Sequence, residues 1–183
     1  TITELAPLIR DGELSSVELT DSQLDRIERL DGKLKAYATV MADSAREQAR
    51  VADAEIASGN YRGPLHGIPI AVKDLCNTTG VRTMGGSAVF ADNIPDFDST
   101  VVSRFNDAGA VMLGKLNLTE GAMAGYNPKL DVPENPWKES YWSGASSSGS
   151  GCAAAAGLAF GTLGSDTGGS IRFPSAACGN VGL

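Results

Sequence analysis

Gly67-Ile68-Pro69-Ile70-Ala71-Val72-Lys73-Asp74 is a short apolar run that ends in a lysine and an aspartate. Residues 68–72 have the length and composition of a strand that is buried on both faces of a sheet, apart from Pro69 near its start. Lys73 then lies at the carboxyl end of this strand. The sequence therefore predicts a central strand that delivers a lysine to the end of a sheet.

Patterns typical of helices and strands alternate on the N-terminal side of this run. Apolar residues at near-helical spacing predict a helix that ends near Asp31-Gly32, and residues 37–41 favour a strand. Ser44 and Glu47 have the spacing of a capping box, which predicts a second helix that Gly59-Asn60 would end.

The alternation continues on the C-terminal side. The elements expected there are a helix capped by Asp98 or Ser99 and ended by Gly109, a strand over 110–113, a helix over 150–159 and a strand over 160–163. Alternating helices and strands form α/β folds. We therefore predict a mixed, mostly parallel central sheet that is flanked by helices.

Charge and hydropathy narrow the class of function. The 183 residues carry a formal net charge of −7 and no run of basic residues, which argues against nucleic acid or an anionic membrane as a direct partner. The longest apolar stretch, residues 152–163, contains glycine and is shorter than the ~20 residues that a membrane span needs. With no secretory signal recognised, we expect a cytoplasmic enzyme that acts on a small molecule.

The cysteines predict neither a disulfide framework nor a metal site. Cys76, Cys152 and Cys178 are an odd number and show no C-x-x-C spacing. Free cysteine is among the most buried residue types, so we expect all three to be small buried residues.

Two glycine- and serine-rich stretches follow the lysine. They are Ser143-Gly144-Ala145-Ser146-Ser147-Ser148-Gly149-Ser150-Gly151 and Gly164-Ser165-Asp166-Thr167-Gly168-Gly169-Ser170-Ile171-Arg172-Phe173-Pro174. A serine nucleophile needs a base to take its proton. The single histidine, His66, is expected to make a backbone hydrogen bond in its glycine-flanked turn, so Lys73 is the natural candidate base.

Lys73 could act as a base because of where the strand places it. Among neutral side chains its charged form loses solvation, which lowers its pKa. Asp74 need not meet the ammonium, because successive side chains of a strand point to opposite faces.

From the residue types alone, simpler interpretations stay open. Lys73 could extend to solvent at the edge of the sheet, and a run of serines is commonly a turn or a helix cap. A glycine-rich turn by itself is more often only a turn.

The motifs taken together resemble the amidase signature family. The resemblance rests on residues 67–74, on Ser146-Ser147-Ser148 and on Thr167-Gly168-Gly169-Ser170-Ile171-Arg172-Phe173-Pro174, in that order and spacing. It implies a helical lead-in over residues 1–62 and an amidase signature core over residues 63–183, truncated at its C-terminal end because the family's domain is longer.

The same resemblance implies roles for particular residues. Lys73 is the base, Ser146 is the bridging serine that follows a cis peptide bond, and Ser170 is the nucleophile. Ser147 is expected to hold Ser146 through a hydrogen bond. The backbone N–H groups of Thr167, Gly168, Gly169 and Ser170 form an oxyanion hole, and Asp166 and Arg172 form a supporting ion pair.

The expected activity is hydrolysis of linear carboxylic amides to an acid plus ammonia or an amine through an acyl-enzyme. No cofactor or metal is expected, and a homodimer is compatible with the resemblance. One alternative is a glutamine amidotransferase A-type subunit that supplies ammonia to a partner, although residues 125–130 depart from that branch. A second alternative is an inactive fragment, and the acyl and amine specificity stays open.

Overall fold

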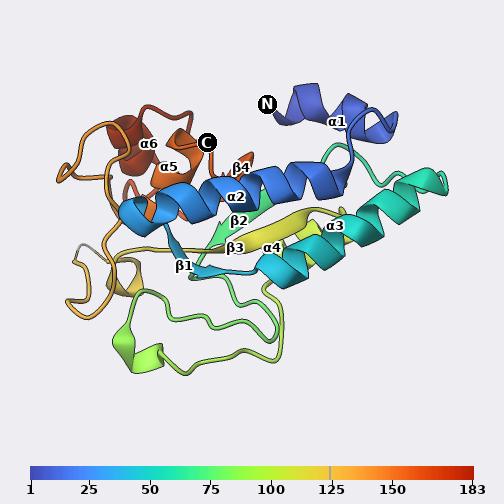
Figure 1. Cartoon of the computed structure of the whole chain (residues 1–183). Helices are drawn as coiled ribbons and strands as arrows, with labels where there is room; N and C mark the ends of the chain where they lie inside the picture. The colour runs from blue at the N-terminus through green and yellow to red at the C-terminus, as the bar shows by residue number, and fades with distance from the viewer. Residues whose placement is uncertain (124) are drawn as a thin grey trace.

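The computed structural model describes residues 1–123 and 125–183, and it places a four-stranded sheet at the centre of the chain (Figure 1). The strand order is β1-β3-β2-β4. The strands are β1 (Tyr37–Val40), β2 (Pro69–Lys73), β3 (Val111–Leu116) and β4 (Gly161–Leu163). β2 pairs in parallel with β3 and β4, while β1 runs antiparallel to β3. The predicted fold class, an α/β fold with a mixed, mostly parallel sheet, is confirmed.

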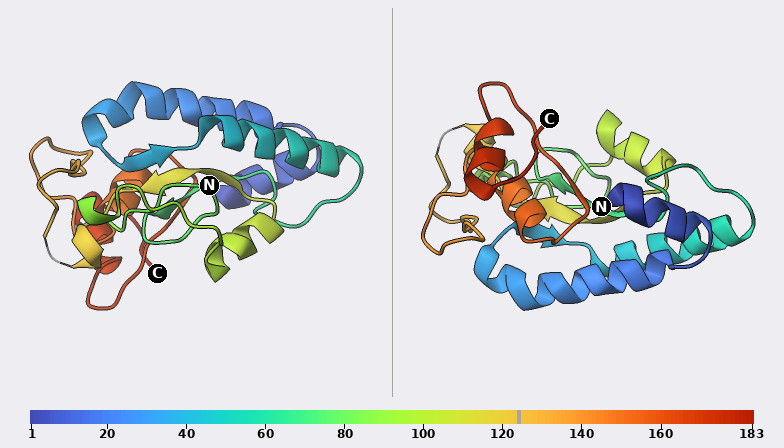
Figure 2. Two further views of the ribbon diagram at one scale, coloured as in Figure 1. Left: turned by 90° about the horizontal axis from the view of Figure 1, so that it is seen from below. Right: turned by 90° about the horizontal axis from the view of Figure 1, so that it is seen from above.

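Helices flank this sheet (Figure 2). The α-helices are α1 (Ile2–Arg10), α2 (Ser16–Leu34), α3 (Ala42–Ala57), α4 (Thr100–Asp107), α5 (Ser148–Ala155) and α6 (Arg172–Cys178), with short 3₁₀ helices η1 (Ala88–Phe90) and η2 (Glu120–Ala122). α2 and α3 lie side by side along the sheet, and α5 packs against α6 near β4. Among the described helices, none combines the length and the apolar character needed to cross a bilayer.

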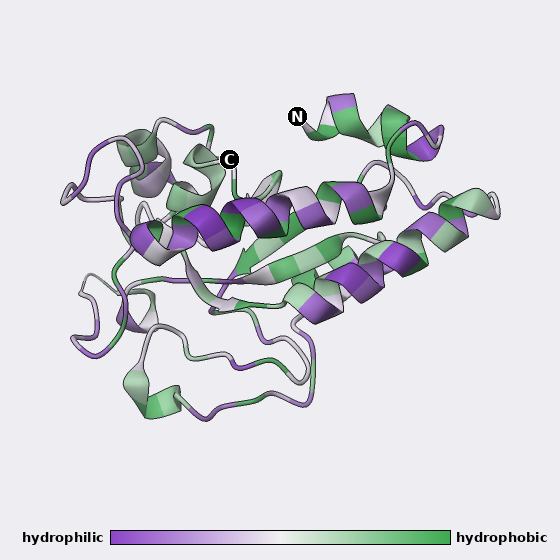
Figure 3. Ribbon diagram, viewed as in Figure 1, coloured by the Kyte–Doolittle hydropathy of each residue, from purple (hydrophilic) through white to green (hydrophobic). Residues whose placement is uncertain are grey.

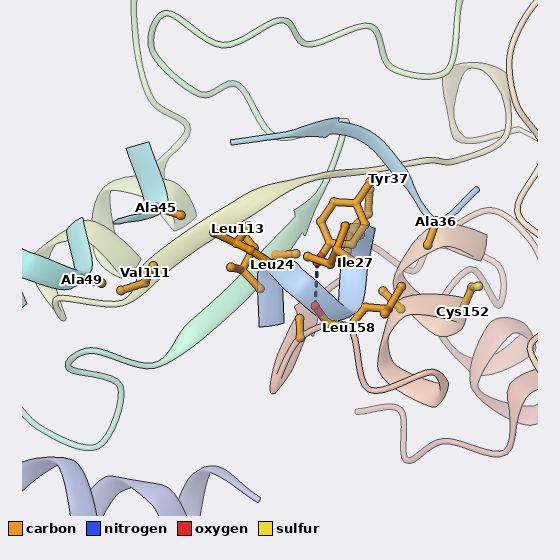
Figure 4. Close-up of a cluster of buried hydrophobic side chains, with 14 residues drawn as sticks. Leu24, Ile27, Ala36, Tyr37, Ala45, Ala49, Val111, Leu113, Cys152 and Leu158 are labelled. Atoms are coloured by element: carbon orange, nitrogen blue, oxygen red, sulfur yellow. Dashed lines mark hydrogen bonds between the residues drawn. The ribbon is translucent and has the colours of Figure 1, made fainter. Parts of the chain in front are cut away.

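The core consists of two apolar clusters, and β2 contributes to both. Ala71 belongs to the cluster under α2, α3 and α5, whereas Ile70 and Val72 belong to the cluster that includes residues of α1 and α4. This division follows the two-residue period of a strand. Figure 4 shows the first cluster, in which the Tyr37 hydroxyl donates to the Leu158 carbonyl at 2.9 Å. All five residues of β2 are buried, as predicted, and Figure 3 shows apolar strands beneath helices with polar outer faces.

The helix α2 ends at Leu34, two to three residues beyond its predicted end near Asp31-Gly32. The helix continues through Gly32 to Leu34, and Lys35 then adopts a left-handed conformation with φ 56°. The Asp31 carboxylate accepts the N–H groups of Ala36 and Tyr37 at 2.8 and 3.2 Å. Asp31 therefore anchors the chain after the helix rather than ending the helix itself.

The predicted capping box of α3 is also wrong. α3 begins at Ala42 with Met41 as its N-cap, so Ser44 lies inside the helix, where its Oγ accepts from the Gln48 side chain at 3.0 Å. The reason is that Met41 N–H donates to the Leu113 carbonyl at 2.8 Å. Pairing with β3 thus continues to Met41, and the helix follows at once.

The remaining boundaries differ by a few residues. α4 begins after Ser99, one of its two predicted caps, while Asp98 accepts the Thr79 N–H at 2.6 Å instead. α5 covers 148–155 rather than 150–159, and Gly157 then turns the chain with φ 64°. β3 extends three residues beyond its predicted end and so buries Lys115, while α1 and α6 were not predicted.

Gly114 allows β1 and β3 to approach each other closely. The register of the β2–β3 pair also shifts at this point: Ile70 pairs with Met112, but the next residue, Ala71, pairs with Gly114. A Cβ atom on Gly114 would lie 2.2 Å from the Thr39 carbonyl oxygen and 2.9 Å from the Tyr37 ring. A side chain at this position would therefore push β1 away from the sheet.

We predict that Gly114→Ala destabilises the complete protein by more than about 2 kcal/mol, because overpacking against backbone cannot be relieved by a rotamer change. Gly32→Ala is the matched control. Gly32 lies within α2 with no atom within 4 Å of an added Cβ, so this change should stabilise the protein by about 0.5–1 kcal/mol. Urea denaturation measures both, and equal stabilities of the two variants would contradict the close approach.

Candidate active site

Lys73 is fully buried at the carboxyl end of β2, and three serine hydroxyls surround its ammonium group. Lys73 Nζ donates to Ser146 Oγ at 2.7 Å, to Ser147 Oγ at 2.9 Å and to Ser165 Oγ at 2.9 Å. A lysine ammonium has three N–H donors, so these contacts account for all of them. Lys73 therefore does not extend to solvent at the edge of the sheet.

Burial lowers the pKa of Lys73 to about 8, because the protein interior solvates an ammonium poorly. The negative charge of Asp166 opposes this shift of the Lys73 pKa to a smaller extent. The depressed pKa predicted from the sequence is confirmed. A substantial fraction of Lys73 is therefore neutral at mildly alkaline pH, which a base requires.

Asp74 points away from Lys73 and pairs with a different lysine. Asp74 Oδ1 lies 3.1 Å from Lys115 Nζ, and the exposed fractions of the two side chains are 1% and 0%. Lys115 also donates to Thr83 Oγ1 at 2.6 Å, and Met84 N–H donates to Asp74 Oδ2 at 2.9 Å. The expectation that Asp74 need not meet the Lys73 ammonium is confirmed. The partner, Lys115, was missed because the predicted strand ended at Leu113.

The peptide bond between Ala145 and Ser146 is cis, at the position that the family resemblance indicates. Ser146 is buried, and its carbonyl accepts the Thr119 N–H at 3.2 Å. The next residue, Ser147, donates its N–H to the Ser170 carbonyl at 3.1 Å. These backbone contacts bring the segment of Ser146 against the segment of Ser170.

The expected hydrogen bond from Ser147 to Ser146 is wrong. The Ser147 hydroxyl accepts from Lys73 and from the Ser165 N–H, at 2.9 and 3.2 Å, and donates to the Ser165 carbonyl at 3.2 Å. Ser147 therefore holds Lys73 and the Ser165 backbone, because its side chain points to the start of the 164–170 turn.

Asp166 organises the turn that carries Ser170. Its carboxylate accepts the backbone N–H groups of Gly169, Ile171 and Arg172 at 2.7, 2.9 and 3.1 Å. It also forms a two-point ion pair with Arg172, whose Nη2 and Nε lie 2.9 and 3.1 Å from it. The Arg172 guanidinium, followed by these amides, holds the pKa of Asp166 far below its usual range. The predicted ion pair is present.

One of the four amides assigned to an oxyanion hole has another partner. Gly169 N–H donates to Asp166 at 2.7 Å, so the carboxylate already uses it. In the described part of the chain, the N–H groups of Thr167, Gly168 and Ser170 donate to no acceptor. These three amides are the ones available to a bound carbonyl oxygen.

An open pocket of about 430 Å³ lies where these segments meet. Its lining consists of Ala122, Met123, Trp142, Ala145, Ser146, Ser165, Thr167, Gly168, Ser170 and Phe173. Within residues 1–123 and 125–183, no hydrogen bond joins Ser170 Oγ to Ser146 Oγ directly. The structure therefore brings Lys73 and Ser146 into contact and places Ser170 in the pocket that Ser146 also lines.

Ser165 is the residue of this site that sequence reasoning missed. It stands at the start of the Asp166 turn, and its hydroxyl is one of the three groups on Lys73. The sequence signal that could have identified Ser165 was its position directly before Asp166 and just after β4. A hydroxyl at that position can reach the end of the neighbouring parallel strand β2, where Lys73 lies. Serine in a glycine-rich stretch is too common for that signal to select it.

His66 takes no part in this cluster. His66 Nδ1 accepts the Arg62 N–H at 3.1 Å, and Nε2 lies 3.0 Å from the Glu55 carboxylate. The predicted backbone hydrogen bond is thus present, with Arg62 as its donor. Desolvation lowers the pKa of His66.

The cysteines are all free, and two of the three are buried as predicted. Cys76 is only half-buried, because it lies in the loop after β2, so that part of the prediction is wrong. No group of three or more His, Cys, Asp or Glu side chains that could hold a metal occurs among the described residues.

Comparisons with known proteins identify the relatives of this chain. The profile of the family Amidase matches residues 18–183. The protein named "Putative amidase AmiD" of Mycobacterium tuberculosis is 57% identical over 182 residues that cover 100% of this chain and 38% of AmiD. The A-type subunit of glutamyl-tRNA(Gln) amidotransferase from Moorella thermoacetica is 49% identical over 185 residues, covering 100% of this chain and 38% of that protein.

A solved structure shows that the fold of this chain is also shared with a known amidase. The native peptide amidase of Stenotrophomonas maltophilia superposes with a TM-score of 0.89 and 37% sequence identity, covering 97% of this chain and 37% of that one. The chain thus spans well under half the length of the relatives that it matches.

We predict that Lys115→Met destabilises the complete protein by about 3–5 kcal/mol, because it leaves the buried Asp74 carboxylate without its counter-charge. Lys33→Met is the matched control, since Lys33 lies 3.0 Å from Glu139 but both side chains are more than two-thirds exposed. An exposed pair contributes little, so this change should have a far smaller effect. Denaturant midpoints of the two variants measure the difference, and equal midpoints would contradict the role of burial.

Proposed function

Because this chain belongs to the Amidase family, we propose that the protein hydrolyses linear carboxylic amides to an acid and ammonia or an amine. The observation that carries the proposal is the 2.7 Å contact of buried Lys73 with Ser146, beside the pocket that holds Ser170. A lysine with a pKa of about 8 supplies the base that an activated serine needs. The names of the relatives support the same reaction class.

The proposed reaction begins with proton transfer toward Lys73. Neutral Lys73 accepts the proton of Ser146 Oγ, Ser146 accepts that of Ser170, and Ser170 Oγ attacks the amide carbon. The proton transfers then run in the reverse direction, so that Ser146 protonates the departing nitrogen as the C–N bond breaks. Water attacks the resulting ester of Ser170 and releases the acid.

The contacts around Lys73 favour Ser146 as the group that gives up its proton. A neutral amine has two N–H donors and one lone pair, so one surrounding hydroxyl must donate to Nζ. The Ser147 hydroxyl donates to the Ser165 carbonyl instead, at 3.2 Å. Ser146 and Ser165 are left to donate, and Ser146 is the shorter contact.

The carbonyl oxygen of the substrate would gain negative charge in this reaction. We assign its stabilisation to the amides of Thr167, Gly168 and Ser170, which face no acceptor among the described residues. Donors fixed in advance by a rigid turn typically contribute about 10²–10³ in rate each. Asp166 and Arg172 keep the turn in shape and have a supporting role.

Several properties of the whole protein stay proposals. A small amide is the partner that the uncharged pocket supports. The acidic net charge of −7 supports a cytoplasmic protein without direct contact to nucleic acid. A homodimer and a division into residues 1–62 and 63–183 are kept as proposals on the family resemblance alone.

A second candidate is an amidotransferase component that releases ammonia from glutamine for a partner. The 49% identity to the Moorella thermoacetica protein favours it. Copurification with partner proteins and glutaminase activity that depends on them would support this candidate. Hydrolysis of simple amides by the purified protein alone would support the amidase.

We predict that Ser170→Ala and Lys73→Ala in the complete protein each reduce amide hydrolysis by at least about 10³-fold, since they remove the nucleophile and its base. Exposed Ser22→Ala and Lys129→Ala are matched controls and should retain normal rates.

A serine-directed fluorophosphonate gives an independent readout of the same residues. It should label Ser170 in the protein but not in the Lys73→Ala variant, as mass spectrometry of the labelled peptide would show. Normal hydrolysis by either variant would overturn the assignment. Labelling of the complete protein, but not of a chain that ends at Leu183, would identify the latter as an inactive fragment.

We predict that kcat/KM rises with pH and levels off above about 8, the pKa of Lys73. The direction follows from the charge, because the protonated ammonium below this pH cannot accept a proton, and the rate should fall about tenfold per pH unit well below it. Steady-state rates between pH 5 and 10 measure the profile. A midpoint near the usual histidine pKa that disappears in His66→Gln would contradict the lysine.

A further inference from the structure

Two aromatic rings stand in the pocket that holds Ser170. The centroids of Trp142 and Phe173 are 6.4 Å apart with an interplanar angle of 42°. The exposed fractions of the two side chains are 57% and 53%, so each ring keeps a large apolar face uncovered. Exposed aromatic surface in a pocket is typical of a ligand contact rather than of a core.

Phe173 is held against the turn of the nucleophile. Its N–H donates to the Gly169 carbonyl at 2.7 Å. A Cβ atom added to Gly169 would lie 2.3 Å from the Phe173 ring, so the ring lies directly against this glycine. Gly169 immediately precedes Ser170, and the ring is thus fixed beside the reacting group.

Trp142 is fixed from the other side. Its carbonyl accepts the Asn135 side-chain amide at 3.1 Å, and its backbone forms an isolated bridge with Glu134. Two residues on, a Cβ atom at Gly144 would lie 2.4 Å from the Pro174 backbone. Direct backbone packing therefore sets the position of the Trp142 segment relative to that of Phe173.

We propose that Trp142 and Phe173 form a subsite that selects amides with an aromatic group on the acyl side. This inference rests on the proposed amide hydrolysis. All described residues that line the pocket are uncharged, so nothing there offsets the desolvation of a charged acyl group. Two tilted rings with open faces provide the edge and face contacts that another ring prefers.

The order of the proposed proton transfers indicates that the aromatic group belongs on the acyl side of the amide rather than on the amine side. The departing nitrogen must lie at Ser146, which returns the proton to it. We place the group on the other side of the carbonyl toward Phe173, because the Phe173 ring lies against Gly169, the residue before Ser170. Aromatic contacts of this kind contribute about two- to tenfold in binding for each ring.

The test compares 3-phenylpropionamide with propionamide in the complete protein. Both release ammonia, so the added phenyl group can act only from the acyl side. We expect kcat/KM to favour the phenyl compound by at least about tenfold. Trp142→Leu and Phe173→Leu keep apolar volume but remove a ring, so each should reduce the ratio of the two kcat/KM values by about two- to tenfold.

Phe90→Leu is the matched control. Phe90 is 55% exposed, close to Phe173 in this respect, but lies in η1 and does not line the pocket. The Phe90→Leu variant should prefer 3-phenylpropionamide over propionamide to the same extent as the unmodified protein. A protein without preference for the phenyl compound, or ring variants that keep the full preference, would overturn the subsite.

A binding measurement separates this inference from the reaction itself. Calorimetric titration of the Ser170→Ala variant with the two amides should show the same preference for the phenyl compound, and loss of that preference when Trp142→Leu is added. If no amide is hydrolysed but this preference persists, the hydrolase proposal fails and the subsite stands. If hydrolysis proceeds and neither binding nor rate depends on the rings, the subsite fails alone.

Discussion

Burial of the Lys73 ammonium is the constraint on which the rest of the site depends. A charged group taken out of water must find hydrogen-bond partners, and Lys73 finds three serine hydroxyls. These serines come from two segments, 146–147 and 164–170, which are also joined by hydrogen bonds of Ser147 with the Ser165 backbone and the Ser170 carbonyl. The same contacts that satisfy the lysine therefore bring the two glycine-rich stretches together over the end of β2.

Two buried lysines at the same end of neighbouring strands show how their surroundings decide their chemistry. Lys115 has a carboxylate 3.1 Å away, and this ion pair opposes the fall in its pKa that burial causes. Lys73 has only neutral hydroxyls in direct contact, so desolvation dominates and its pKa falls to about 8. The pleat of β2 makes this difference, since it turns Asp74 away from Lys73 and toward β3. One lysine is thereby suited to structure and the other to proton transfer.

The sequence was most informative where the composition of a whole run of residues suits one structural element. The apolar run before Lys73 predicted the central strand, and an apolar strand end predicted the lowered pKa of Lys73. Prediction failed where a tertiary contact overrides a local pattern. Ser44 matches a capping box, but pairing of Met41 with Leu113 starts α3 earlier. The partners of Ser147, Lys73 and Ser165, depend on how distant segments meet, which no local spacing encodes.

Asp166 explains how a glycine-rich turn can hold unpaired backbone N–H groups in fixed positions. Three consecutive or nearly consecutive N–H groups on one short turn would ordinarily donate to water or to nearby carbonyl oxygens. The Asp166 carboxylate takes those of Gly169, Ile171 and Arg172, and the guanidinium of Arg172 balances its charge. The amides that remain, those of Thr167, Gly168 and Ser170, then belong to a backbone whose shape is already fixed. Because the donors are fixed before a substrate arrives, a developing negative charge would be stabilised without the cost of reorganising the turn.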